Sequence, residues 1–124
     1  MNGLLLYLGG ALTICWGVAH VFPTSKVVQG FGQITRDNRL ILTMEWVAEA
    51  ILLIFTGVLI VVMTARFGAR GTATQTAAAV SAAMLLVLAG VSSGTGGRVD
   101  FIMYRLCAPI FVLSAALLLT GAFA

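Results

Sequence analysis

The chain contains four long apolar runs, at about 4–22, 40–64, 74–92 and 99–123, separated by more polar connections. Each run approaches or exceeds the roughly 20 residues that a helix needs to cross a bilayer. A backbone in lipid must satisfy its own hydrogen bonds, and an apolar segment of this length does so as a helix. The sequence therefore predicts an all-α integral membrane protein whose four transmembrane helices form an antiparallel bundle.

Composition excludes the other broad classes. Of the 124 residues, 60% are hydrophobic and only 9% carry a formal charge, which is more apolar surface than a soluble domain of this size can bury. The seven Lys and Arg residues are scattered, without the basic run typical of nucleic-acid binding. We expect a single transmembrane domain over residues 1–124, located in the cell membrane, with the lipid bilayer as a partner and no nucleic acid.

The connections predict the topology. Four spans place both termini on one side of the membrane and the 23–39 and 94–98 connections on the other. This second side carries more cations, namely Lys26, Arg36, Arg39 and Arg98, against Arg66 and Arg70 on the first. The positive-inside rule therefore favours termini outside the cytoplasm.

The 23–39 connection is long and carries apolar residues at helical spacing, namely Val27, Val28, Phe31 and Ile34. This pattern predicts a short interfacial helix between the first two spans. Gly30 and Gly32 would make such a helix easy to break, so a re-entrant loop is the alternative.

Ionisable side chains lie inside the second apolar run, where a charge costs about 3 kcal/mol and usually has a partner or a function. Glu45 and Glu49 are four residues apart and share one helix face. At 1.5 Å per residue, Glu45 lies about 7–8 Å and Glu49 about 13–14 Å from the 23–39 side. His20 ends the first run on that same side.

The fourth run begins at this side too, and it brings Asp100, Tyr104 and Arg105 to matching depths. Trp16 and Trp46 lie at the same level on the first two spans. Charged groups from separate helices share one level when they pair or line a common cavity. The sequence therefore predicts one polar site in this half of the membrane.

Two sets of ion pairs are expected in this half. Arg105 is predicted to pair with Glu45 or Glu49, and Arg98 or Arg39 with Asp100. A purely structural alternative is that such pairs only set the helix register, with the tryptophans as an aromatic belt. Glu49 fits this alternative poorly, because few cations are available for a second, deeper carboxylate.

These residues predict an intramembrane pocket for a small amphipathic or lipid-like molecule. The candidate catalytic residues are Glu45, Glu49 and His20, and the candidate ligand-binding residues are Trp16, Trp46, Tyr104, Arg105 and Asp100. An enzyme with this set would perform proton transfer, such as a double-bond shift or a dehydration. Whether the protein is an enzyme stays open, the sequence indicates no particular cofactor, and a single histidine predicts no metal centre.

Two other functions stay open. In length and number of spans the chain is similar to the small multidrug-resistance transporters, which would imply a proton-coupled transporter acting as a dimer. The key glutamate of that family lies in the first span, however, and this first span has none.

The second alternative is an accessory or assembly subunit of a larger membrane complex. Gly3, Gly10 and Gly17 recur every seven residues on the first run and would form a contact face, as would the alanine-rich third run. Cys15 and Cys107 lack a Cys-x-x-Cys spacing, so we expect apolar filler, with a redox pair as the alternative.

Overall fold

The computed structural model describes residues 1–124 and is entirely helical. In chain order its elements are α1 (Asn2–Val21), α2 (Thr24–Gln29), α3 (Arg36–Phe67), α4 (Thr72–Gly94), the single 3₁₀ turn η1 (Gly96–Arg98) and α5 (Ile102–Phe123). The four long helices are each long and apolar enough to cross a membrane. The chain is a small multi-pass membrane protein, and the predicted four-helix bundle is confirmed.

The connection between the first two spans contains the predicted short helix, α2. Val28 is its buried residue, and α2 packs against α3. Beyond α2 the chain turns at Gly32, whose φ of +73° lies in a region that glycine adopts readily. The interfacial-helix pattern was therefore the correct interpretation of this segment's secondary structure.

The helix α3 is longer than the apolar run that predicted it. It begins at Arg36 because the side chain of Thr35 accepts a hydrogen bond from the Asn38 backbone N–H at 3.2 Å and caps the helix. Its 32 residues extend about 48 Å at 1.5 Å per residue, more than the roughly 30 Å hydrocarbon core of a bilayer. Its polar first turns therefore reach beyond the apolar run, at the same end of the bundle as α2.

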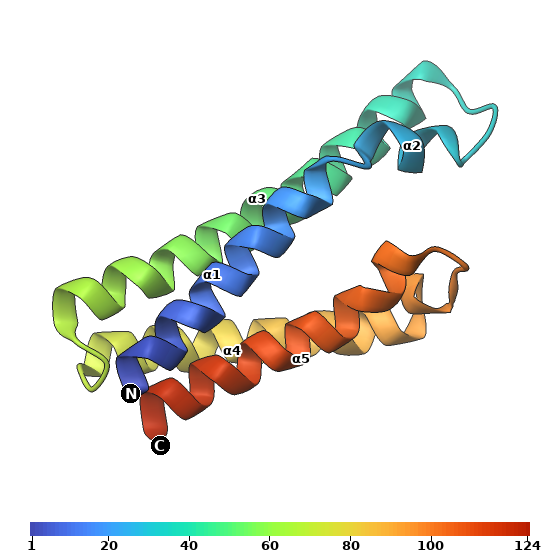
Figure 1. Ribbon diagram of the computed structural model, residues 1–124. Coiled ribbons are helices and arrows are strands. Elements are labelled where there is room, and N and C mark those ends of the chain that lie inside the picture. Colours follow the sequence, from blue (N-terminus) through green and yellow to red (C-terminus); the bar gives the residue numbers. More distant parts are fainter.

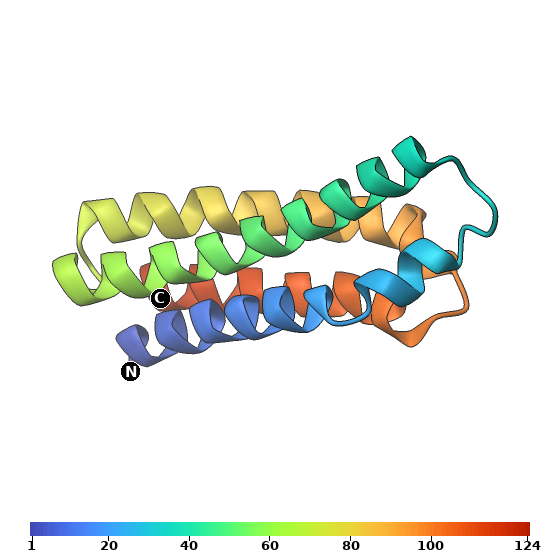
Figure 2. The same cartoon turned by 90° about the horizontal axis from the view of Figure 1, so that it is seen from above.

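Figure 1 shows the bundle as two helix pairs, α1 with α3 and α4 with α5. The pairs lie close together at the end that holds both termini and diverge toward the end that holds α2 and η1. Seen from above, in Figure 2, the four long helices run roughly parallel, so the divergence occurs mainly in one plane.

The α1–α3 contact is made through glycine. A Cβ added to Gly57 of α3 would collide with the carbonyl oxygen of Gly10, and one added to Gly17 would lie 2.9 Å from the Ala50 carbonyl oxygen. Membrane helices commonly associate through such small residues, which let the backbones approach. Two glycines of the predicted stripe thus serve packing within the bundle, whereas Gly3 faces open space.

The apolar core runs from the middle of the bundle to the end with the termini. Its largest fully buried side chains are Leu6, Leu53, Ile60, Leu85, Phe111 and Leu118. Two side chains near the α3–α4 turn close this end by donating to carbonyls of the C-terminal residues. Gln75 Nε2 donates to Ala122 at 2.9 Å, and Arg70 Nη2 donates to Ala124 at 2.6 Å. The polar side chains named from the sequence all lie toward the other end.

Candidate functional site

A histidine and a glutamate from neighbouring helices form the centre of the candidate site. His20 lies in the last turn of α1 and is only 3% exposed. Its Nε2 is 3.4 Å from Oε2 of Glu49 on α3, whose side chain is 34% exposed. The two groups are within ion-pair distance, but Nε2 has no hydrogen-bond partner. The imidazole is therefore buried beside a carboxylate without an aligned hydrogen bond between them.

Trp46 on α3 holds this histidine in place. Its ring stacks on the imidazole with the centroids 3.9 Å apart and the planes at 15°. Its Nε1 also donates a hydrogen bond of 2.8 Å to the His20 carbonyl oxygen. Carbonyls in the last turn of a helix lack an intrahelical donor, so the indole satisfies one of them. Tyr104 of α5 meets Trp46 edge-on at 5.5 Å, which links a third helix to the cluster.

A cavity of about 210 Å³, here called the polar cavity, lies against this cluster. Both members of the ion pair line it, together with hydroxyl and thiol groups from α4 and α5. The polar side chains in its wall are His20, Trp46, Glu49, Ser92, Thr95, Tyr104 and Cys107.

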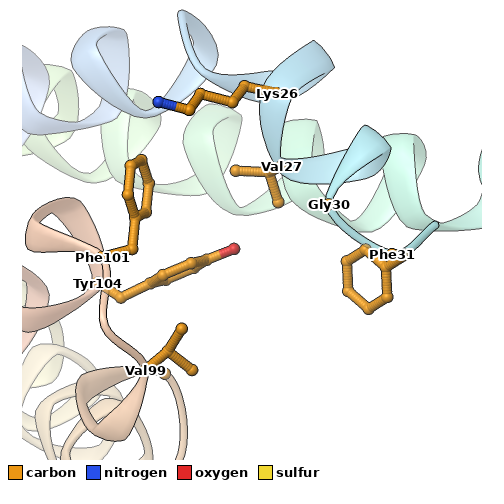
Figure 3. Close-up of a pocket in the computed structure, with 8 residues that line it drawn as sticks. Lys26, Val27, Gly30, Phe31, Val99, Phe101 and Tyr104 are labelled. Atoms are coloured by element: carbon orange, nitrogen blue, oxygen red, sulfur yellow. The ribbon is translucent and has the colours of Figure 1, made fainter.

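Two further cavities adjoin the polar cavity through shared residues. The acidic cavity, of about 220 Å³, is lined by Glu45 and Glu49 of α3 and by Val27, Phe31, Trp46 and Tyr104. The apolar cavity, of about 430 Å³, lies between α2 and the start of α5, where Val27, Phe31, Val99 and Phe101 form apolar walls. Tyr104 lines all three cavities, and in Figure 3 its ring extends between Val99 and Val27 in the apolar cavity.

The predicted ion pairs of Arg105 are wrong. Its Nη2 lies 2.9 Å from Asp100 Oδ1, and its Nε donates to the Val99 carbonyl oxygen at 3.3 Å. Both charged side chains are exposed, Arg105 by 54% and Asp100 by 97%. The guanidinium reaches back to the residues before α5, because their acceptors are closer than the carboxylates of α3. For the same reason Asp100 pairs with Arg105 rather than with Arg98 or Arg39 as predicted.

The other predicted site residues divide into two groups. Glu45, Glu49, His20, Trp46 and Tyr104 come together around the polar and acidic cavities. Trp16 instead lies in the packed core at 9% exposure, lines none of these three cavities, and has no hydrogen-bond partner for its Nε1.

Among the residues that line the cavities, sequence reasoning did not place Lys26, Phe101 or Cys107 in the site. The Lys26 Nζ lies 5.4 Å from the centroid of the Phe101 ring, and Figure 3 shows the lysine extending over this ring. The apolar spacing of the 23–39 segment predicted a helix near the site, but not which of its side chains would face α5. Both cysteines are free, with Cys15 exposed and Cys107 buried.

The polar and acidic cavities carry hydrogen-bonding and proton-accepting groups, and they adjoin the apolar cavity. No group of three or more His, Cys, Asp or Glu side chains lies close enough together to hold a metal ion. The imidazole, the two carboxylates and the phenol are the groups of this site that can donate or accept a proton. The chain matches no protein-family model, no curated protein and no solved structure.

Proposed function

We propose that this membrane protein binds a small amphipathic or lipid-like molecule at the α2 end of the bundle. The polar group of the molecule enters the polar and acidic cavities, and its hydrocarbon part occupies the apolar cavity. The observation that carries this proposal is the buried imidazole of His20. It lacks a hydrogen-bond partner, lies beside Glu49, and lines a cavity that adjoins a larger apolar one.

The size and walls of the cavities support an amphipathic ligand. The apolar cavity alone, at about 430 Å³, falls within the range of roughly 300–1,000 Å³ that is usual for small-molecule sites. Ligand sites of this kind combine apolar walls with a few convergent polar groups. Here Val27, Val99 and Phe101 provide the walls, and Tyr104 provides a hydroxyl group at the junction with the polar cavity.

If the bound molecule is also chemically changed, the groups available favour proton transfer. An imidazole and a carboxylate at 3.4 Å can hold a proton between them and exchange it with a ligand. Glu45 lines the acidic cavity with Glu49 and would be the second acid or base. The four spans require a bilayer, and we propose the cell membrane as the location.

Filling the apolar cavity tests the proposal. Val99→Phe places a larger side chain at a position that is 50% exposed and outside the long helices, so the bundle should still form. Displacing two methylene groups of a ligand costs about 1.6 kcal/mol, which is roughly a tenfold loss of affinity. The control is Val80→Phe, the same change at a lipid-facing position of α4 that is 67% exposed and lines none of these cavities.

Binding is measured by native mass spectrometry of the protein released from dodecyl maltoside micelles. The protein is titrated with twelve-carbon amphiphiles that carry neutral, anionic or cationic head groups. We expect at least one head group to form a saturable one-to-one adduct with the wild type and with Val80→Phe, and to bind Val99→Phe about tenfold more weakly. Absence of any saturable adduct, or equal binding to both variants, would contradict the proposal.

The accessory-subunit alternative has one observation in its favour. The α4 glycines Gly90 and Gly94 have no atom within 4 Å of an added Cβ, so this part of α4 is free for a partner helix or a second copy. A wild-type protein that forms no ligand adduct but co-purifies with a stoichiometric partner would support that alternative instead.

A further inference from the structure

We propose that the polar group of this ligand is a protonated amine that carries at least one N–H. This inference rests on the proposed function and specifies its ligand class. The ammonium group lies in the polar cavity, within hydrogen-bond distance of both Nε2 of His20 and Oε2 of Glu49, with Trp46 and Tyr104 beside it. The ligand is therefore a long-chain amine rather than a fatty acid, an alcohol or a quaternary ammonium compound.

The first argument is the buried His20 Nε2, which has no hydrogen-bond partner and lies beside the partly exposed Glu49 carboxylate. A carboxylate only accepts hydrogen bonds, and a neutral imidazole with its proton on Nδ1 presents Nε2 as a second acceptor. These atoms lie 3.4 Å apart in the wall of the polar cavity, and Nε2 has no partner although its side chain is 97% buried. An ammonium N–H directed at both atoms would satisfy both at once.

The second argument is the distribution of charge. The polar and acidic cavities contain two carboxylates, Glu45 and Glu49, and no Lys or Arg lines either of them. The nearby cations have other partners, since Arg105 pairs with Asp100, and Lys26, which lines the apolar cavity, lies over the Phe101 ring. Two carboxylates without a guanidinium or ammonium partner favour a cationic ligand over an anionic one.

The third argument is the aromatic wall. Trp46 and Tyr104 line both the polar and the acidic cavity and meet edge to face at 84°. Aromatic faces attract ammonium groups, and the attraction increases when water is excluded. The hydrocarbon tail then continues past Tyr104 into the apolar cavity, which this residue also lines.

A head-group series with a constant twelve-carbon tail tests the ligand class on the wild-type protein. The compounds are dodecylamine, dodecyltrimethylammonium, dodecanol and dodecanoate, titrated at neutral pH and measured by native mass spectrometry. At neutral pH dodecylamine is protonated, because its amine resembles that of lysine, which has a pKa of about 10.4. We expect it to bind at least about tenfold more tightly than the trimethylammonium compound, which has no N–H to donate.

A matched pair of variants tests the position of the head group. Glu49→Gln removes the charge with little change of shape, and we expect dodecylamine to bind roughly 10- to 100-fold more weakly, as for loss of a charge-assisted hydrogen bond. Asp37→Asn makes the same change at an exposed residue in the first turn of α3, and binding should be unchanged.

Two results would overturn the inference. One is dodecanoate, dodecanol or dodecyltrimethylammonium binding as tightly as dodecylamine to the wild type. The other is Glu49→Gln binding dodecylamine like Asp37→Asn. In either case saturable binding that Val99→Phe weakens would leave the proposed function standing, so the two failures are distinguishable. The head-group series needs no variant, and it decides the question even if Glu49→Gln does not fold.

Discussion

At the scale of single residues, the candidate site is organised by Trp46. One indole stacks on the imidazole of His20, donates to the same residue's carbonyl oxygen and meets Tyr104 edge-on. It thereby joins α1, α3 and α5 where the two helix pairs diverge. The hydrogen bond also provides a donor to the C-terminal turn of α1, just before the chain turns at Pro23.

Replacing the Trp46 indole should therefore lower the stability of the protein. We expect Trp46→Phe to lower the free energy of unfolding by about 1–2 kcal/mol, because the His20 carbonyl loses its donor. Unfolding is followed by circular dichroism during titration of dodecyl maltoside micelles with sodium dodecyl sulfate. Trp16→Phe is the comparison, since it makes the same change of ring at a position whose Nε1 donates to no backbone carbonyl. Equal stability of Trp46→Phe and the wild type would contradict this role.

One physical cause explains which side-chain positions could be predicted from the sequence and which could not. Helix periodicity and rise place a residue at a depth and on a face, and these were sufficient to bring His20, Glu49 and Tyr104 together. They do not determine where a long side chain reaches. Arg105 has enough freedom to turn back to Asp100 and the Val99 carbonyl, and no spacing rule distinguishes that conformation from one directed at α3.

At the scale of the helices, the contact within the α1–α3 pair and the contact within the α4–α5 pair are made by different kinds of residue. The α1–α3 contact depends on the meeting of Gly10 with Gly57, whereas α4 packs against α5 through small and large side chains such as Ala82 and Phe111. The number and order of the spans could be predicted from apolar runs alone. The divergence of the pairs could not, because it depends on how side chains pack between the pairs, at the α1–α5 and α3–α4 contacts, rather than on any one run.

The glycine contact leads to a prediction with an internal control. Gly57→Ala places a methyl group against the Gly10 carbonyl and the Ile14 side chain, so we expect a loss of about 1–3 kcal/mol in the free energy of unfolding. Gly90→Ala makes the same change on α4, where nothing lies within 4 Å, and should be neutral or stabilising by up to about 1 kcal/mol through helix propensity. The same detergent titration measures both variants. Equal effects would mean that the α1–α3 helices do not approach at this point.

At the scale of the whole molecule, the two ends differ in packing and in charge. The end with the termini is packed by fully buried apolar side chains and closed by hydrogen bonds from Arg70 and Gln75. The α2 end contains the three cavities and most of the cations, including Lys26 and Arg98. The positive-inside rule predicts that this end faces the cytoplasm, and an amphipathic ligand would then enter from the cytoplasmic leaflet.

This orientation can be measured with single cysteines in a background carrying Cys15→Ser and Cys107→Ser. Ser25→Cys is exposed on α2 and Thr72→Cys is exposed at the start of α4, at opposite ends of the bundle. We expect a membrane-impermeant maleimide to label Thr72→Cys in intact cells and Ser25→Cys only after lysis. The reverse pattern would place the cations of the α2 end outside. Ligand would then enter from the outer leaflet, because the cavities lie at that end whichever way the bundle is inserted.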